Sequence, residues 1–241
     1  MSQRGDICAA LADFGFSAVA YLGPLNGENG QAPQLTSVGF SNEWEQAYRS
    51  HWHQHDPLPR IAQAGHPIFW MGHGLPEHPL SSDERAYLAQ LSQWGMRDCV
   101  GALCVGPNMR TAFVLVGGRD PSKMLEQPDL GALQAIIQVS FLRYCALLEE
   151  ELTQPALTDR EYEILRLLAQ GEAQENIAPI TGLSEGSVRT YCYGLFRKLG
   201  AKDPASAVLR GVSYGLVSIP PRVPTSVAAR HAEALKDAGW R

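Results

Sequence analysis

Apolar residues recur every three to four positions along much of the chain, a spacing that gathers them on one face of a helix. The longest such stretch, from Leu125 to Leu152, predicts a long amphipathic helix. Three shorter stretches predict helices in the same way: residues 7–14, 44–52 and 81–94. At the start of the last one, Ser81 stands three positions before Glu84, which is the spacing of a capping box.

Between these helices, short apolar runs bounded by glycine, proline and polar residues predict β-strands. They lie at residues 17–22, 35–40, 66–70, 100–105 and 112–118, and the turn sequence GPNMR joins the last two. Strands mixed with helices in this order favour an α+β fold, in which helices pack in layers against a sheet.

The periodic pattern stops at the sequence TQPAL, residues 153–157, where a proline and polar residues end the long helix. We interpret this segment as a linker. It separates two predicted domains, residues 1–152 and residues 158–217. A C-terminal extension, residues 218–241, follows the second domain. The extension opens with several prolines, and Thr225 or Ser226 is placed to cap a short alanine-rich helix within it.

The C-terminal domain carries the start and stop signals of short helices. Thr158 and Glu161 form a capping box, and Gly171 ends the helix that they open. A second helix of about residues 174–180 leads through a tight turn to a third helix, which Ser184 caps.

The third of these helices has one apolar and one polar face. Its inward residues follow the helical repeat: Val188, Cys192, Leu195 and Leu199. Polar, aromatic and basic residues remain outside: Arg189, Thr190, Tyr193 and Arg197. A fourth helix at 205–214 closes the bundle. A short helix, a glycine turn and a helix with a basic exposed face form the helix-turn-helix layout, whose second helix enters the major groove of DNA.

Charge is unevenly distributed along the chain, whose formal net charge is −5 at pH 7. Residues 1–152 hold 9 Lys or Arg against 16 Asp or Glu, and residues 158–217 hold 7 against 7. Residues 218–241 hold 4 against 2. DNA-binding modules usually have a basic surplus, because neutralising phosphates supplies much of their affinity. Because residues 158–217 carry no net charge, we expect the domain to bind DNA only as a dimer, with an affinity that depends only weakly on salt concentration.

Cysteine usage and hydropathy indicate a cytoplasmic globular protein with no membrane partner. The five cysteines are scattered and never spaced C-x-x-C, which argues against a disulfide framework or a zinc ribbon. No apolar run approaches the roughly 18 to 20 residues of a membrane span. The N-terminus carries Asp6 and Asp13 within its short apolar stretch, unlike a signal peptide.

Residues 157–217 resemble the C-terminal helix-turn-helix of the LuxR family of transcription regulators. The shared landmarks are LT-x-RE at 157–161, Gly171, the pair Ile177-Ala178, SE-x-SV at 184–188 and KLG at 198–200. A run of matches over about 60 residues is far more specific than a single short motif. The resemblance implies a regulator that binds double-stranded promoter DNA as a dimer and is not an enzyme.

Four positions bear on how well this domain binds DNA. Glu172, Asn176 and Tyr191 stand where the family usually has Lys, Glu and His. Pro179 falls within the second helix, which tolerates it only near its first turn. These features put DNA affinity in question and leave the fold unaffected.

The sequence FSNEWEQAYRSHWHQHDPLPRIAQAGHPIFW, residues 40–70, resembles the autoinducer-binding domain of quorum-sensing LuxR proteins. The pattern is filled by Trp44, Tyr48, Asp56-Pro57 and Trp70, with Tyr48 and Asp56 one residue closer than usual. The resemblance implies an N-terminal α/β/α sandwich that dimerises and binds an N-acyl homoserine lactone or a related signal. An all-α, four-helix helix-turn-helix domain would follow it. No metal, other cofactor or catalytic residue is implied.

The side chains of this pattern suit an acylated lactone. The Trp44 indole can donate to the lactone carbonyl and Asp56 can accept from the ligand amide, while aromatic rings wall the pocket. Phe40 stands where the family often has a Tyr that donates to the acyl carbonyl, so that hydrogen bond comes from elsewhere or is absent. The predicted ligand-binding residues are Phe40, Trp44, Tyr48, Trp52, Asp56 and Trp70. Without the family pattern, the aromatic residues would be interpreted as the core of an α+β domain.

The predicted DNA-binding residues lie on the third helix and in the turn after it: Ser187, Arg189, Thr190, Tyr193, Arg197, Lys198 and Lys202. Arg189 and Tyr193, one turn apart, are the candidates for base contacts. Arg197, Lys198 and Lys202 are the candidates for phosphate contacts.

Two other functions are weighed against this one. His51, His53 and His55 alternate as in metal-binding sequences and would suit a metal-dependent hydrolase, although only the outer two share a helix face. The neutral C-terminal domain, with Glu172 and Tyr191, would suit a weak DNA binder that forms inactive heterodimers with a related activator.

Overall fold

The computed structural model describes residues 3–23, 34–118, 120, 122, 127–151, 154–219, 230, 233–234 and 237. The chain divides into two compact units, Met1–Thr153 and Gln154–Arg241. Each unit has its own hydrophobic core and is described by itself. Thr225 and Ser226, the expected caps of a helix in the extension, lie outside the described residues.

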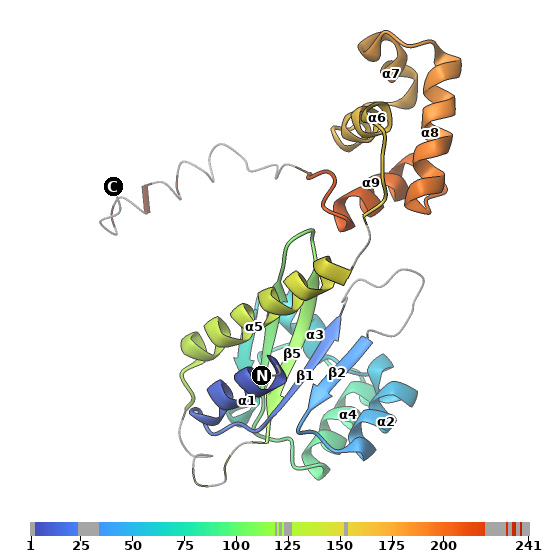
Figure 1. Cartoon of the computed structure of the whole chain (residues 1–241). Coiled ribbons are helices and arrows are strands. Elements are labelled where there is room, and N and C mark those ends of the chain that lie inside the picture. The colour runs from blue at the N-terminus through green and yellow to red at the C-terminus, as the bar shows by residue number, and fades with distance from the viewer. Residues whose placement is uncertain are drawn as a thin grey trace. The chain divides into compact units, whose positions relative to one another are not determined.

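The N-terminal unit is built on a five-stranded sheet of order β2-β1-β5-β4-β3, with all neighbours antiparallel (Figure 1). Its strands are β1 (Ala18–Gly23), β2 (Gln34–Val38), β3 (Ile68–Trp70), β4 (Val100–Val105) and β5 (Thr111–Gly117). Central strand β5 is almost wholly buried, because both of its faces are covered by helices. All five apolar runs of the sequence therefore form strands of one sheet.

Helices cover both faces of this sheet. They are α1 (Gln3–Ala12), α2 (Asn42–Ser50), α3 (Leu58–Gln63), α4 (Ser82–Gln93) and α5 (Leu130–Glu151), with 3-10 turns η2 (Trp52–Gln54) and η3 (Met71–His73). Helices α1 and α5 pack on one face, while α2, α3 and α4 pack on the other (Figure 1). The expected α+β fold with an α/β/α sandwich is confirmed.

The sheet separates two cores, and the alternation of side chains along each strand decides which core a residue joins. On β1, Val19 joins the core under α1 and α5, whereas Ala20 and Leu22 join the core under α2 to α4. The second core holds the largest aromatic cluster of the unit and is the site of interest below.

Helix α5 is long and apolar enough, by length and composition alone, to cross a membrane over Leu130–Leu148. The expectation that no stretch of the chain approaches this length was wrong. In the structure one stripe of α5 packs on the sheet: Leu133, Ile137, Phe141 and Cys145. Other apolar side chains of the helix are exposed: Val139, Leu142, Tyr144 and Leu147.

The C-terminal unit is a bundle of α6 (Asp159–Ala169), α7 (Gln174–Thr181), α8 (Glu185–Leu199) and α9 (Pro204–Ser213). Thr158 and Glu161 form the expected capping box of α6, and Ser184 caps α8 by accepting from the Ser187 amide. Gly182, in the left-handed conformation at φ 68°, makes the turn between α7 and α8, where a side chain would be strained.

The α8 stripe expected to face inward is buried, as are Ala207 and Val212 of α9. One expectation was wrong: Pro179 lies in the second turn of α7, beyond its first turn. The side chain of Pro179 is exposed, and the preceding turn is exposed at Glu175, so water can solvate the carbonyl that lacks its helical partner.

Candidate ligand-binding and DNA-binding sites

Helix α2 directs two aromatic side chains into the core beneath α2 to α4. Ser41 caps the helix by accepting from the Trp44 amide, which fixes where the first turn begins. Trp44 and Tyr48, four residues apart, therefore lie on the same face, and both are fully buried. Their ring centroids are 5.4 Å apart.

Asp56 follows the 3-10 turn after α2 and brings a carboxylate to these rings. Its Oδ2 accepts from the Tyr48 hydroxyl at 2.9 Å, and its Oδ1 accepts from the Leu58 amide at 2.9 Å. The residue is half-buried and its carboxyl is the enclosed part. Burial raises the pKa of Asp56 to about 7, although the bonds from Leu58 and Tyr48 favour the charged form. The carboxyl group therefore titrates near neutral pH.

Two buried polar atoms of the same core have no hydrogen-bond partner among the described residues: the Trp44 indole nitrogen and the Tyr87 hydroxyl. Burial raises the pKa of Tyr87 well above 10, Asp56 and Tyr48 add to the rise, and the Trp44 N–H opposes it. The indole thus lies near the hydroxyl without reaching hydrogen-bond geometry. An unsatisfied buried polar group costs about 1–3 kcal/mol, so this arrangement favours an outside partner.

Aromatic rings surround these polar groups. Phe40 lies 4.7 Å from Trp44 and Trp52 lies 5.7 Å from Tyr87, measured between ring centroids. Phe69 of β3 and Phe113 of β5 belong to the same core and stack at 6.2 Å. The result is an apolar enclosure with a few convergent polar atoms, the usual make-up of a small-molecule site.

Trp70 does not join this enclosure, so its expected place in the pocket wall was wrong. It pairs with Val100 in register and belongs to the opposite core, and its indole donates to Asp98. The two-residue repeat of β3 turns Phe69 toward α2 to α4 instead. Sequence reasoning also missed Tyr87; the apolar repeat of its helix was the only signal that pointed to it.

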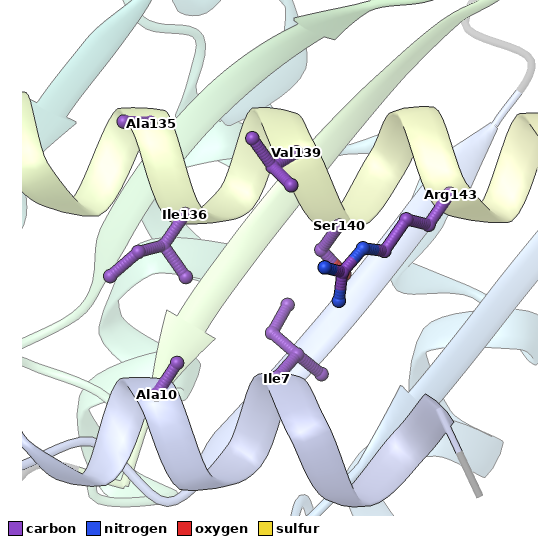
Figure 2. A pocket seen from close by; sticks show the side chains of 7 residues that line it. All are labelled: Ile7, Ala10, Ala135, Ile136, Val139, Ser140 and Arg143. Atoms are coloured by element: carbon purple, nitrogen blue, oxygen red, sulfur yellow. The ribbon is translucent and has the colours of Figure 1, made fainter.

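A groove of about 330 Å³ lies between α1 and α5, on the other face of the sheet (Figure 2). It is lined by Ile7, Ala10, Ala135, Ile136, Val139, Ser140 and Arg143. None of the buried, unpaired polar atoms lies there. We therefore place the candidate ligand site at Asp56 and not in this groove.

The alternating histidines do not assemble a metal site in the part of the chain that the structure describes, where no group of three or more His, Cys, Asp or Glu is arranged to hold an ion. His53 contacts the Tyr48 carbonyl through Nδ1 at 3.1 Å, and His55 lies 3.9 Å from exposed Asp83. The rings of His51 and Trp52 meet edge to face, with 4.9 Å between their centroids.

Helix α8 presents a polar face on the C-terminal unit. Arg189, Thr190, Tyr193 and Arg197 are exposed, with Tyr193 at 71%, and Lys202 is exposed in the turn that follows. Ser187 is half-buried beside the cap, its hydroxyl 2.9 Å from that of Ser184. Arg189, Thr190, Tyr193 and Arg197 therefore share one exposed face of α8.

Lys198 differs from the other predicted DNA contacts. Its Nζ donates to Glu161 Oε2 at 2.6 Å, and only 30% of its side chain is exposed. Its charge is engaged inside the domain, which competes with the phosphate contact that its position predicts. The side chain instead joins the end of α8 to the start of α6.

An α/β/α sandwich whose aromatic core holds buried polar atoms, followed along the chain by a helix-turn-helix bundle, is typical of a signal-responsive transcription regulator. Residues 4–144 match the model of the autoinducer binding domain, and residues 155–210 match that of the bacterial regulatory proteins of the luxR family. The chain therefore belongs to the LuxR family of quorum-sensing transcription regulators.

Similarity to individual relatives extends over nearly the whole chain. This chain is 28% identical to the quorum sensing-dependent transcriptional regulator RpaR of Rhodopseudomonas palustris, and the aligned region covers 87% of this chain and 86% of RpaR. It is 29% identical to the transcriptional activator TraR of Rhizobium radiobacter, covering 89% and 94%. Escherichia coli SdiA shares the fold with a TM-score of 0.63 at 17% identity, covering 90% and 91%.

Proposed function

We propose that this regulator binds an N-acyl homoserine lactone in its N-terminal unit and promoter DNA through α8, acting as a cytoplasmic homodimer. The observation that carries the proposal is that Tyr48 contacts both the enclosed Asp56 carboxyl and the ring of Trp44, whose buried N–H has no partner among the described residues. A buried acceptor and a buried donor around one side chain favour a ligand with a complementary N–H and carbonyl. The amide and lactone groups of this ligand class supply both.

The contacts around Asp56 indicate how the ligand is held. Each carboxylate oxygen accepts one protein hydrogen bond and retains a lone pair, so the ligand amide N–H has an acceptor. Trp44 donates to the lactone carbonyl. The acyl chain packs against aromatic rings: Phe40, Trp52, Phe69 and Phe113. Tyr48 acts through Asp56, because its hydroxyl orients the carboxylate.

On the C-terminal unit, Arg189 and Tyr193 are proposed to contact base edges in the major groove, with Thr190 beside them. Ser187 near the helix N-terminus, Arg197 and Lys202 are proposed to contact phosphates. Because residues 158–217 carry no net charge, two domains on a two-fold DNA site are needed to reach useful affinity.

Exposed apolar residues on α5 support a dimer. Val139, which lines the groove between α5 and α1, is 49% exposed (Figure 2). Leu142, three residues further along the same helix, is 43% exposed. Exposed apolar patches on a folded domain commonly mark a protein interface. A second copy of the chain, packed on this face, would bring two C-terminal units into one complex.

The ligand proposal is tested by thermal unfolding of the full chain with N-acyl homoserine lactones of 4 to 12 acyl carbons. A ligand that binds only the folded state raises the unfolding temperature. We expect a rise for the wild type and for Asp83→Asn, whose carboxylate is 69% exposed, and none for Asp56→Asn. No rise with any chain length, or an equal rise in Asp56→Asn, would contradict the proposal.

The DNA proposal is tested by gel shift at low salt with fragments of the promoters near the gene. We expect a complex that strengthens with the lactone and whose stoichiometry is two chains per site. Absence of any complex, with and without the lactone, would favour the other hypothesis, that the chain forms inactive heterodimers with a related activator.

A further inference from the structure

Tyr87 places a hydroxyl in the aromatic core, where it has no hydrogen-bond partner among the residues that the structure describes. The residue lies on α4 and is fully buried. The start of α4 is fixed by the Ser81–Glu84 capping box, and Arg60 holds Glu84 at 2.6 Å. Tyr87 follows Glu84 by three residues, so the helix that carries its ring is anchored less than one turn away.

The Tyr87 ring lies among the side chains that we propose to bind the ligand. The Tyr87 ring centroid lies 6.1 Å from that of Tyr48 and 5.7 Å from that of Trp52. The charge of Asp56 raises the pKa of this hydroxyl, and the nearby Trp44 side chain lowers it. Phe40, which contacts the Trp44 ring, has no hydrogen-bond donor on its side chain. In the described part of the core, Trp44 and Tyr87 are the side chains with a free buried donor.

We propose that Tyr87 is a ligand-binding residue whose hydroxyl donates to the acyl carbonyl oxygen of the signal, while Trp44 donates to its lactone carbonyl. This inference rests on the proposed function, since it assigns an atom of the same ligand. It defines the ligand as one with two carbonyl oxygens on either side of an N–H. Asp56 accepts from that N–H.

The test compares Tyr87→Phe with Tyr21→Phe in the full chain. Tyr21 is a matched control, because its hydroxyl pairs with Ser140 at 2.8 Å in the opposite core. Binding of N-octanoyl homoserine lactone is measured by calorimetric titration. We expect Tyr87→Phe to weaken binding about tenfold, the effect of one hydrogen bond, and Tyr21→Phe to leave it within about twofold.

A second ligand assigns the carbonyl. N-(tetrahydrofuran-3-yl)octanamide keeps the amide and lacks the lactone carbonyl. Trp44→Phe should weaken binding of N-octanoyl homoserine lactone but should not weaken binding of this compound. The tenfold effect of Tyr87→Phe should persist with both ligands. Loss of the Tyr87 effect instead would show that its hydroxyl does not bind the acyl carbonyl, which overturns the assignment.

Stability of the unliganded chain separates recognition from packing. Removing an unpaired buried hydroxyl should leave the unfolding temperature of Tyr87→Phe equal to or above that of the wild type. Weaker binding together with a lower unfolding temperature would show a structural role and overturn the inference. If the wild type binds the lactone and Tyr87→Phe binds it equally well, only this inference fails. If the wild type binds no lactone, the proposed function fails with it.

Discussion

Lys198 at the end of α8 donates to Glu161 in the first turn of α6, with 2.6 Å between Nζ and Oε2. The Glu161 carboxylate also accepts from the amide and hydroxyl of Thr158, at 2.7 and 2.9 Å. One buried carboxylate therefore completes the capping box of α6 and fixes the end of α8 against α6. Hydrogen bonds from Lys198 and Thr158 outweigh burial and hold the pKa of Glu161 below its usual value.

Lys198→Met should destabilise the C-terminal unit by about 1–3 kcal/mol, because it leaves a buried charged acceptor with fewer partners. The pKa of Glu161 should rise toward its unfolded value. A group whose folded pKa is lowered stabilises the fold above its unfolded pKa and loses that effect as the pH falls. Acid unfolding of the variant, followed by circular dichroism, should therefore begin at a higher pH. An unchanged acid midpoint would contradict this role.

Gly194→Ala should also destabilise this unit, although alanine is the better helix former by about 1 kcal/mol. A Cβ at position 194 would lie 2.7 Å from Glu161 Oε1, and that oxygen belongs to a carboxylate held by three hydrogen bonds. Gly186, on the exposed start of the same helix, is the control, because a Cβ there meets nothing closer than 3.9 Å. Urea unfolding should show Gly186→Ala stabilised and Gly194→Ala destabilised; the same sign for both would refute the close approach.

The fold follows closely from the sequence because its signals are local. Apolar periods of two and near four separate strands from helices, and the boxes at Ser81 and Thr158 start their helices where expected. Pro179 is the exception, since helix α7 continues through a residue that removes a backbone donor. Tertiary packing of Ile177 and Ala178 on the bundle core outweighs that local preference.

The site was less predictable, because it depends on which face of the sheet a residue meets. Trp70 and Phe69 are neighbours in sequence, and because side chains alternate along β3 they lie in opposite cores. The pairing of β3 with β4 decides which residue joins which core. Tyr87 lies far from the family pattern along the chain, so only the packing of α4 against α2 brings its hydroxyl near Asp56. The family pattern did locate the part of the candidate site that is local in sequence, namely α2 and the turn that follows it.

Without ligand, the N-terminal unit should lose stability as the pH rises from 4 to 7. Asp56 has a folded pKa of about 7, above the ordinary 3.8, so the folded state binds more protons than the unfolded chain in this interval. The loss from this group is at most about 4 kcal/mol. Asp56→Asn should flatten the slope in urea unfolding at pH 4 to 7, while Asp83→Asn should keep it. Equal slopes for the wild type and Asp56→Asn across the interval would contradict a buried carboxyl at this position.

Two substitutions among the proposed DNA contacts, one on α8 and one in the turn after it, should have different effects on DNA binding. Arg189→Ala should weaken binding to the best promoter fragment by about 1–3 kcal/mol and relax sequence preference, because it removes a base contact. Lys202→Ala should weaken binding to all sequences alike and reduce the magnitude of the salt slope by about one, because one phosphate is no longer neutralised.

Arg166→Ala, which replaces an exposed arginine on α6, is the control and should change neither the affinity nor the salt slope. Fluorescence anisotropy with matched and scrambled duplexes at several salt concentrations measures both. Equal loss on the two duplexes for Arg189→Ala would place that residue on the phosphate backbone instead of the bases.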